Sequence, residues 1–355
     1  MSIYMTLYIW SVLVLGSAQF ITIEARKIFF LVLVFVPLLL VLGGRGPSVG
    51  TDTPMYNALF YSLQGLFDGS YQDVNIEFSY ILISNVLGIF TYESQSIIFF
   101  YAFFTIITTA WLFCNKSYNL FASTIIFISL FYFENFNGMR QCLSVALSYV
   151  ALFQFIHQKK LQGIIINILA TFIHSSAMLF FVIFLFYPLN KKKLVIIISL
   201  AIVVAYFIQI YGMDIAFYYL ADSNKYGGYL LSSQYGASKE VGAGIIKVIG
   251  FILTILMAFF VLRKKNLDND RQDVYYMGLL LFLSCIATIM QYNIMIFYRL
   301  IYPFAFSFCF FVPLICKYIS FNKYFFYLPA ALFLAYYLNR MIINTPELQY
   351  VFWNQ

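Results

Sequence analysis

Long runs of apolar residues, separated by short polar segments, follow one another along the chain. A helix that crosses a membrane needs about 20 predominantly apolar residues. Ten runs approach or reach this length, and we predict that each crosses a membrane: 3–20, 28–43, 96–113, 118–133, 139–157, 194–211, 245–262, 274–291, 295–316 and 321–340. Because the runs are continuous rather than alternating, they predict helices and not the strands of an outer-membrane barrel.

Two further apolar regions have a different pattern. Residues 78–91 form one short stretch, which we interpret as a re-entrant or interfacial helix. Residues 162–189 are interrupted at His174-Ser175-Ser176, which predicts two short helices that meet inside the membrane. Each half of about 14 residues would extend about 21 Å, less than the hydrocarbon core of about 30 Å. We therefore expect the tip of this hairpin to lie in a cavity below the outer surface.

Clusters of Lys and Arg between the runs indicate an orientation, because basic connections favour the cytoplasmic side. All of these basic clusters lie on the cytoplasmic side if residues 162–189 cross the membrane twice and residues 78–91 do not cross it. This arrangement gives about 12 spans with both termini outside. The clusters are Arg26-Lys27, Lys116, Lys159-Lys160, Lys191-Lys192-Lys193, Arg263-Lys264-Lys265 with Arg271, and Lys317 with Lys323. Two long outer loops result, at 44–77 and 212–243.

Composition supports the same class. Hydrophobic residues make up 63% and charged residues 10% of the 355 residues, against about 45–50% and about 25% in soluble domains. This excludes a soluble enzyme, a disordered chain and a disulfide scaffold. We predict an all-α polytopic bundle in which 1–355 form a single integral membrane domain with the two outer loops as periplasmic insertions. The positive-inside bias explains the net charge of +7 better than nucleic-acid binding does.

Several classes of chemistry have no support in the sequence. The five cysteines are scattered through apolar runs without CxxC spacing, so we expect neither a metal nor a disulfide framework. No cofactor is expected. There is no Walker-type phosphate loop and no cytoplasmic connection long enough for a nucleotide-binding domain, which excludes ATP-driven transport by this chain alone. The second outer loop is rich in Tyr, Gly and Ser, which fits either an interfacial aromatic belt or stacking on sugar rings.

Ionisable residues near the apolar layer are costly there, so each is a candidate functional residue. Arg45 and Asp52 lie in an irregular segment rich in Gly and Pro, where they either pair with each other or face a polar substrate. Glu77 opens the short 78–91 helix and either caps it or lines a polar cavity. Arg140 follows Asn137, the expected N-cap, and lies in a first helical turn where a cation opposes the helix dipole.

That placement of Arg140 favours an anionic partner over simple snorkelling to the interface, and a guanidinium suits phosphate oxygens. Gln141 and the helix N-terminus would add donors to the same anion. His174, at the apex of the broken hairpin, is either a packing residue or a base for a hydroxyl group. Arg299 is expected to be a second buried cation on the same side, on a helix bent by Pro303. It either binds an anionic ligand or forms a structural ion pair with Glu77 or Asp52.

Together, arginines, a histidine, carboxylates and an aromatic loop are predicted to meet at the outer face. Two arginines suit a diphosphate, the lipid surroundings suit a prenyl tail, and a histidine base suits a sugar hydroxyl. The combination favours glycosyl transfer from a lipid diphosphate donor outside the cytoplasm.

At these residues the chain resembles the EpsG family of bacterial polysaccharide polymerases, which is related in role to Wzy-type O-antigen polymerases. The resemblance covers most of the chain, and one departure is Gly46-Pro47, where the family usually has an aromatic residue after the arginine. The segments that carry it are Arg45 with Gly50-Thr51-Asp52 and Tyr56, Glu77-Phe78-Ser79-Tyr80, Asn137-Gly138-Met139-Arg140-Gln141, Phe172-Ile173-His174-Ser175-Ser176-Ala177, Arg299 with Tyr302, and Gln349-Tyr350-Val351-Phe352.

The resemblance implies a GT-C-like, metal-independent enzyme in the bacterial inner membrane. Such an enzyme moves a growing glycan from undecaprenyl diphosphate to the sugar end of a new lipid-linked unit at the periplasmic face, in exopolysaccharide or lipopolysaccharide synthesis. Its partners would be the lipid-linked donor and acceptor and a chain-length regulator. Carried onto this chain, catalysis falls to His174, Asp52 and Glu77, diphosphate binding to Arg140, Arg299, Arg45 and Gln141, and sugar contacts to Asn137, Tyr56, Tyr302 and Ser175.

Two other functions share some of these features. A carrier or flippase for lipid-linked oligosaccharides also has a cationic cavity, but alternating access favours polar groups on both sides of the midplane. A membrane O-acyltransferase also uses an intramembrane histidine, but its acyl donor comes from the cytoplasm, and His174 is predicted to face the other side.

Overall fold

The computed structural model describes residues 3–17, 29–63, 76–220, 252, 255–256, 270–291, 297–318 and 350–353. Within these ranges the regular elements are all helices, and an isolated antiparallel bridge joins Arg45 to Phe352. The prediction of an all-α fold is confirmed. Other predicted features lie outside the described residues: the span 321–340, almost all of the span 245–262, residues 221–243 of the second outer loop, and the basic clusters at 26–27, 263–265 and 323.

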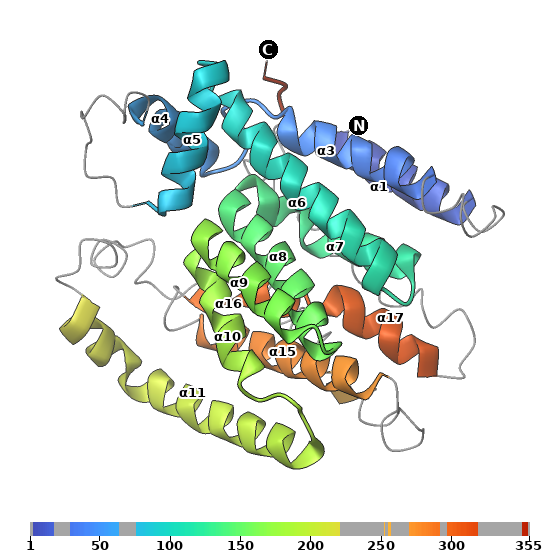
Figure 1. The fold of residues 1–355 in the computed structure, drawn as a ribbon, viewed down its shortest axis with the longest axis vertical. Helices are drawn as coiled ribbons and strands as arrows, with labels where there is room; N and C mark the ends of the chain where they lie inside the picture. Colours follow the sequence, from blue (N-terminus) through green and yellow to red (C-terminus); the bar gives the residue numbers. More distant parts are fainter. Residues whose placement is uncertain are drawn as a thin grey trace. The chain divides into compact units, whose positions relative to one another are not determined.

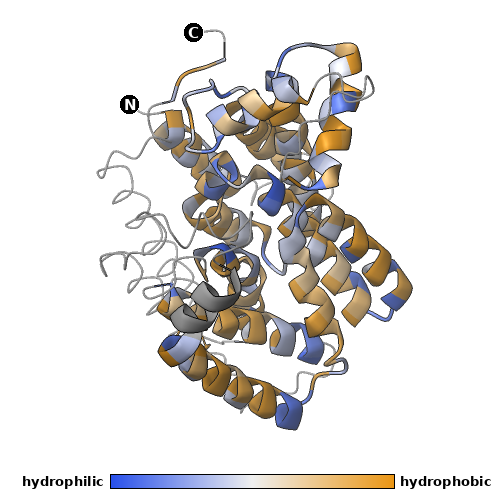
Figure 2. Cartoon of the chain, turned by 90° about the vertical axis from the view of Figure 1, so that its left-hand side faces the viewer, coloured by the Kyte–Doolittle hydropathy of each residue, from blue (hydrophilic) through white to orange (hydrophobic). Residues whose placement is uncertain are grey.

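Five helical stretches in the described ranges are long and apolar enough to cross a membrane: Gln95–Lys116, Met139–Ile156, Lys191–Tyr211, Arg271–Met290 and Tyr298–Tyr318. Six shorter apolar helices cover Ile3–Ser17, Val32–Gly43, Phe78–Phe90, Leu120–Leu130, Lys160–Ile173 and Ser175–Phe184. In Figure 2 these helices are hydrophobic along most of their lengths, and hydrophilic segments gather at helix ends and connections. The chain is therefore a membrane protein by composition and helix length, while about 12 crossings and a GT-C-like fold remain predictions.

The chain divides into two compact units. The first comprises Met1–Phe155, Lys160–Phe180 and Asn322–Gln355, and the second comprises Ile156–Lys159 and Phe181–Phe321. All of the candidate residues except Arg299 and Tyr302 belong to the first unit. A single integral membrane domain remains a prediction.

Helix α6 has a central position in the first unit, since it contacts α3, α4, α5 and α7 (Figure 1). The first-unit helices are α1 (Ile3–Ser17), the π-helical turn η2 (Leu31–Phe35), α3 (Val36–Gly43), α4 (Thr53–Ser62), α5 (Phe78–Phe90), α6 (Gln95–Lys116), α7 (Leu120–Leu130), the 3₁₀ turn η4 (Tyr132–Phe136), α8 (Met139–Ile156), α9 (Lys160–Ile173), the 3₁₀ turn η5 (Ser175–Ala177) and the start of α10 (Met178–Phe184).

Local sequence signals explain several helix ends in this unit. Helix α3 stops at Gly43, and the N–H of Gly44 returns to the carbonyl of Leu40 at 2.9 Å. Pro54 lies in the first turn of α4, where its missing N–H costs no helix hydrogen bond. Asn119 caps α7, because its Oδ1 accepts a hydrogen bond from the N–H of Ala122 at 3.0 Å.

The loop between α3 and α4 is attached to the start of α8. Gly50 has a φ of +91° and lies so close to the carbonyl of Phe136 that a Cβ would be 2.5 Å from this oxygen. A side chain at position 50 is therefore excluded on both conformational and steric grounds. The next residue, Thr51, donates its N–H to Asn137 Oδ1 at 2.8 Å. This loop thus fixes the segment that leads into Arg140.

The described part of the C-terminal tail is bound to the same loop. Gly46 donates its N–H to the carbonyl of Val351 at 2.7 Å, and Trp353 donates its N–H to the carbonyl of Gly44 at 3.1 Å. The hydroxyl of Tyr350 donates to the carbonyl of Val41 at 2.8 Å. Residues 44–46 and 350–353 therefore lie at the same end of the first unit, as expected if both face one side of the membrane.

The second unit contains α11 (Lys191–Leu220), α15 (Arg271–Met290), α16 (Tyr298–Ala305) and α17 (Phe308–Tyr318), together with the end of α10. Helix α15 contacts α11, α16 and α17. Pro303 lies inside α16, and the helix direction is interrupted at residues 306–307 before α17 begins. The predicted bend at Pro303 remains a prediction, and the turn at residues 306–307 lies three residues after it. Residues 212–220, expected in the second outer loop, instead continue α11.

The connections predicted to be cytoplasmic meet within the second unit. Gln272 Nε2 donates to the carbonyl of Leu189 at 2.9 Å, and Lys317 Nζ pairs with Asp270 Oδ2 at 2.5 Å. His157 Nε2 lies 3.4 Å from Asp273 Oδ1. These contacts join the 156–159, 189–193, 270–273 and 317 segments, as expected if they share one side of the membrane. The assignment of that side to the cytoplasm remains a prediction.

Candidate functional site

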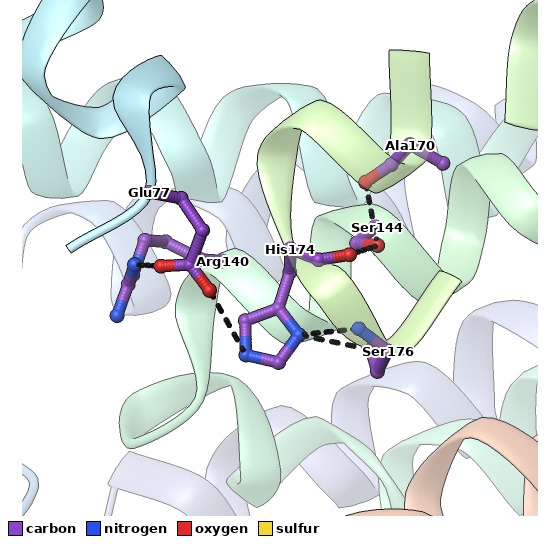
Figure 3. A network of polar contacts seen from close by, with 6 residues as sticks. All are labelled: Glu77, Arg140, Ser144, Ala170, His174 and Ser176. Atoms are coloured by element: carbon purple, nitrogen blue, oxygen red, sulfur yellow. Dashed lines mark hydrogen bonds and ion pairs between the residues drawn. The ribbon is translucent and has the colours of Figure 1, made fainter. Parts of the chain in front are cut away.

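Three ionisable side chains from separate segments meet in the first unit (Figure 3). Glu77 precedes α5, Arg140 lies in the first turn of α8, and His174 follows α9. Arg140 Nη1 forms an ion pair with Glu77 Oε2, and Glu77 Oε1 lies 3.9 Å from His174 Nε2. The exposed fraction of the side chain is 13% for Arg140, 16% for Glu77 and 15% for His174. The three groups thus form one partly buried cluster, which we call the Arg140 cluster.

Aromatic rings hold the Arg140 guanidinium in place. Its central carbon lies 5.5 Å from the ring centroids of both Tyr56 and Tyr80, a distance at which a cation is attracted to a ring face. The hydroxyl of Tyr80 donates to the carbonyl of Tyr56 at 2.8 Å, and Tyr80 stacks on Tyr101 at 6.2 Å. Burial raises the pKa of the Tyr56 hydroxyl, while the charge of Arg140 acts in the opposite direction. Tyr56 therefore remains neutral at physiological pH.

The break in the 162–189 hairpin lies at His174, as predicted. This residue is extended, with φ −156° and ψ 133°, between α9 and η5. Its Nδ1 accepts a hydrogen bond from the N–H of Ser176 at 3.2 Å and lies 2.9 Å from Ser176 Oγ. Because a backbone N–H can only donate, a neutral His174 carries its proton on Nε2, the nitrogen that faces Glu77. In this tautomer the protonated Nε2 of His174 points toward Glu77 across a separation of 3.9 Å.

Helix α8 also fixes the tip of this hairpin. Ser144, one helical turn after Arg140, donates its hydroxyl toward the carbonyls of Ala170 at 2.9 Å and His174 at 3.2 Å. Residues four apart lie on the same helix face. One face of α8 therefore carries both the cation and the contact that positions the histidine.

Arg45 has a different environment from Arg140. Its side chain is enclosed, with 1% of the residue exposed, and lies over the ring of Phe136 at 5.2 Å. Nε donates to Thr53 Oγ1 at 3.2 Å, and Nη1 donates to the carbonyl of Leu42 at 3.0 Å. Burial lowers the pKa of Arg45 to about 10, so it remains charged at neutral pH. No described carboxylate pairs with Arg45, so the alternative of an Arg45–Asp52 pair is wrong. Nη2 of Arg45 is buried without a hydrogen-bond partner among the described residues, and a diphosphate contact at Arg45 remains a prediction.

Other predicted residues surround the Arg140 cluster. Asp52 Oδ1 accepts a hydrogen bond from Thr51 Oγ1 at 3.3 Å. Asn137 holds the loop through Thr51, and the first α8 hydrogen bond runs from Cys142 to Gly138, so Gly138 occupies the N-cap position predicted for Asn137. Gln141 is half-buried in the first turn of α8, and Ser175 is exposed at the hairpin tip. Their roles as base, donor and sugar contacts remain predictions.

Arg299 and Tyr302 belong to α16 of the second unit. Arg299 is exposed, so the prediction that it is a buried cation is wrong, and Glu77 pairs with Arg140. Tyr302 is buried. A contribution of either residue to the Arg140 cluster remains a prediction.

Sequence reasoning gave no role to four residues that build this cluster: Tyr80, Tyr101, Ser144 and Ser176. Helical spacing could have identified two of them. Tyr80 lies three residues after Glu77 and Ser144 lies four residues after Arg140, and such spacings bring side chains to one helix face. In the described ranges no group of three or more His, Cys, Asp or Glu residues could hold a metal ion, and metal independence remains a prediction.

Comparison with known proteins gives a family. The family model of the EpsG family matches residues 28–353, which is most of the chain. The chain is also similar to the amylovoran biosynthesis protein AmsC of Erwinia amylovora, with 28% identity over 171 residues, or 46% of this chain. That match spans 45% of the relative's length, so less than half of it is covered. No solved structure matches significantly. On the extent of the family match, the chain belongs to the EpsG family.

Proposed function

We propose that this chain is a glycosyltransferase that polymerises lipid-diphosphate-linked oligosaccharide repeat units. A growing glycan leaves undecaprenyl diphosphate and is joined to the sugar end of a second lipid-linked unit, at the periplasmic face of the bacterial inner membrane. Membership of the EpsG family and the similarity to an amylovoran biosynthesis protein support an exopolysaccharide polymerase type of function in broad terms. The apolar helices support a membrane location.

The observation that carries the proposal is the convergence of Arg140, Glu77 and His174 within one partly buried cluster. Arg140 is the donor-binding group. A guanidinium binds phosphate oxygens in a two-pronged geometry and remains charged when partly buried. Its charge stabilises the diphosphate as the bond to the glycan breaks, and a cluster shielded from bulk water strengthens that interaction.

The helix end at Arg140 favours an anion for a second reason. The first N–H groups of a helix lack partners within the helix and attract negative charge. A cation in this turn opposes the dipole unless an anion lies beside it. Glu77 fills that role in the described structure, and a phosphate oxygen has the same charge and acceptor character.

The test is polymerisation in vitro. The purified full-length chain, reconstituted in liposomes with a lipid-diphosphate-linked repeat unit, is expected to give a ladder of longer glycans. Arg140→Gln removes the charge at similar size and should reduce the rate about 100-fold or more. Lys159→Gln removes one charge at an exposed position and serves as the control, with a normal ladder.

Two results would contradict the proposal. One, a normal ladder from an Arg140→Gln variant that inserts as well as the wild type, contradicts the donor-binding role of Arg140. The other is movement of lipid-linked sugars across the liposome membrane without any polymer, since that outcome indicates a carrier.

A further inference from the structure

We infer that Glu77 is the catalytic base. Arg140 masks the Glu77 carboxylate until the donor diphosphate displaces this carboxylate from the guanidinium. His174 then positions the freed carboxylate and does not accept the proton. This inference rests on the proposed function, since it assigns the proton transfer within the same site. It starts from the connectivity of the Arg140 cluster, in which a single carboxylate bridges a guanidinium and an imidazole.

His174 has one ring nitrogen that is already engaged. Its Nδ1 receives the Ser176 N–H at 3.2 Å, so the lone pair that a base needs is already engaged at that nitrogen. The other nitrogen, Nε2, carries the proton in the neutral ring and faces Glu77 Oε1. A ring in this tautomer can donate toward an anion but cannot take a proton from a hydroxyl on that side. The imidazole is therefore a positioning group.

Arg140 has a hydrogen-bond donor that its ion pair with Glu77 does not use. Nη1 of Arg140 pairs with Glu77, and Nε of Arg140 is buried without a hydrogen-bond partner among the described residues. A diphosphate has more oxygens and more charge than one carboxylate and can engage a guanidinium through two prongs. The donor diphosphate thus competes with Glu77 for the same cation. The carboxylate occupies the position that a phosphate oxygen takes in the complex.

Glu77 Oε1 and His174 Nε2 are 3.9 Å apart. This distance is too long for a hydrogen bond, and a small shift of Glu77 away from Arg140 brings the two atoms into range. The Nε2–H then holds the freed carboxylate in its ionised form. A base that is unmasked only when the donor is bound does not act before the diphosphate has arrived.

The transfer balances as follows. The acceptor hydroxyl gives its proton to the Glu77 carboxylate, while its oxygen forms a bond to the anomeric carbon of the donor glycan. The bond between that carbon and the phosphate oxygen breaks, and its electron pair leaves with the lipid diphosphate, whose charge Arg140 stabilises. Glu77 releases the proton to solvent and returns to Arg140 once the lipid diphosphate has left.

The inference predicts opposite effects of one substitution on binding and on turnover. In Glu77→Gln the negative charge that competes with diphosphate for Arg140 is gone. The purified variant in detergent should therefore bind inorganic diphosphate about tenfold more tightly, which is about 1.4 kcal/mol of binding free energy. Isothermal titration calorimetry measures this affinity. The same variant should polymerise at least about 100-fold more slowly, because its base is lost. Glu93→Gln, at an exposed position, is the matched control and should change neither quantity.

A second pair of variants tests the role of His174. Gln carries an N–H near the position of Nε2 but cannot accept a proton, so His174→Gln should retain roughly a tenth of the activity, whereas His174→Ala should retain far less. If Gln and Ala are equally inactive, or if Glu77→Gln binds diphosphate more weakly or still polymerises, the inference is overturned. Failure of the proposed function appears differently: the wild-type chain itself would then give no polymer from the lipid-diphosphate-linked repeat unit.

Discussion

Two arginines at the same end of the first unit have opposite environments. Both guanidinium groups lie near aromatic rings, Arg45 over Phe136 and Arg140 beside the neighbouring rings of Tyr56 and Tyr80. Arg45 is 1% exposed and donates to a hydroxyl and a carbonyl, both neutral. Arg140 is 13% exposed and faces a carboxylate.

This difference indicates that Arg45 stabilises the fold, whereas Arg140 can contact a substrate. The hydrogen bonds and the ring contact of Arg45 lie between the end of α3, the loop at 49–53 and the turn before α8, and its Nη2 is buried without a hydrogen-bond partner among the described residues. Its charge serves the carbonyl at the C-terminal end of a helix, where a cation is favoured. Arg140 has a partner that a stronger anion can replace. Near an apolar layer, an arginine is thus a candidate substrate contact only when its partner is exchangeable.

The largest expected effect comes from Arg140→Lys. Lysine keeps the charge but loses the planar fork and the stacking on two rings, so polymerisation in vitro should fall about 100-fold. The melting temperature of the purified chain should change little, because the substitution leaves a cation beside Glu77.

The matched variant is Arg45→Lys, for which we expect the opposite result. One of two buried acceptors, Thr53 Oγ1 or the carbonyl of Leu42, loses its donor, which costs about 1–3 kcal/mol. The melting temperature should fall, while the rate per folded molecule stays within a few-fold of the wild type. If Arg45→Lys impairs the rate as strongly as Arg140→Lys does, the two arginines do not differ in role.

An intermediate effect on stability and rate is expected at Gly50, where the loop after Arg45 contacts the segment that leads into Arg140. Gly50→Ala forces a side chain onto a φ of +91° and within 2.5 Å of the Phe136 carbonyl, which should cost at least about 2 kcal/mol. The loop that holds Asn137 would shift, so both the melting temperature and the rate should fall. Gly138→Ala is the control at the same junction, since its Cβ would meet only ordinary contacts at 3.7 Å, and normal stability of Gly50→Ala would contradict this account.

The sequence predicted the elements of this site better than their partners. Hydrophobic run lengths identified the short helix after Glu77, and the polar interruption at His174-Ser175-Ser176 identified the broken hairpin, since both signals are local. The unfavourable position of Arg140 in a helix dipole correctly predicted an anionic neighbour. Glu77 is 63 residues away in sequence, and no local pattern could choose it over Asp52.

The wrong predictions share one physical cause. Arg299 was expected to be buried because it lies in an apolar run, and Arg45 was expected either to pair with nearby Asp52 or to face a substrate. Burial instead depends on which distant segments cover a side chain. Arg45 is covered by Phe136 and by the tail at 350–353, whereas Arg299 is exposed. Hydropathy predicts the depth of a residue in the membrane, and tertiary packing decides whether its side chain is covered by protein or exposed.

The smallest expected effect concerns the ring beneath Arg140. Tyr80→Phe keeps the ring and removes the hydroxyl that donates to the Tyr56 carbonyl at 2.8 Å, so stability should fall by about 1 kcal/mol with the polymerisation rate near that of the wild type. Tyr80→Leu also removes the face that attracts the guanidinium at 5.5 Å, a contact worth roughly 0.5–2 kcal/mol. The rate should then fall a few-fold, because Arg140 is less well aligned with the diphosphate. Equal rates for the Phe and Leu variants would mean that Glu77 alone orients Arg140, and the contrast with the enclosed Arg45 would then depend on the exchangeable carboxylate and not on the aromatic rings.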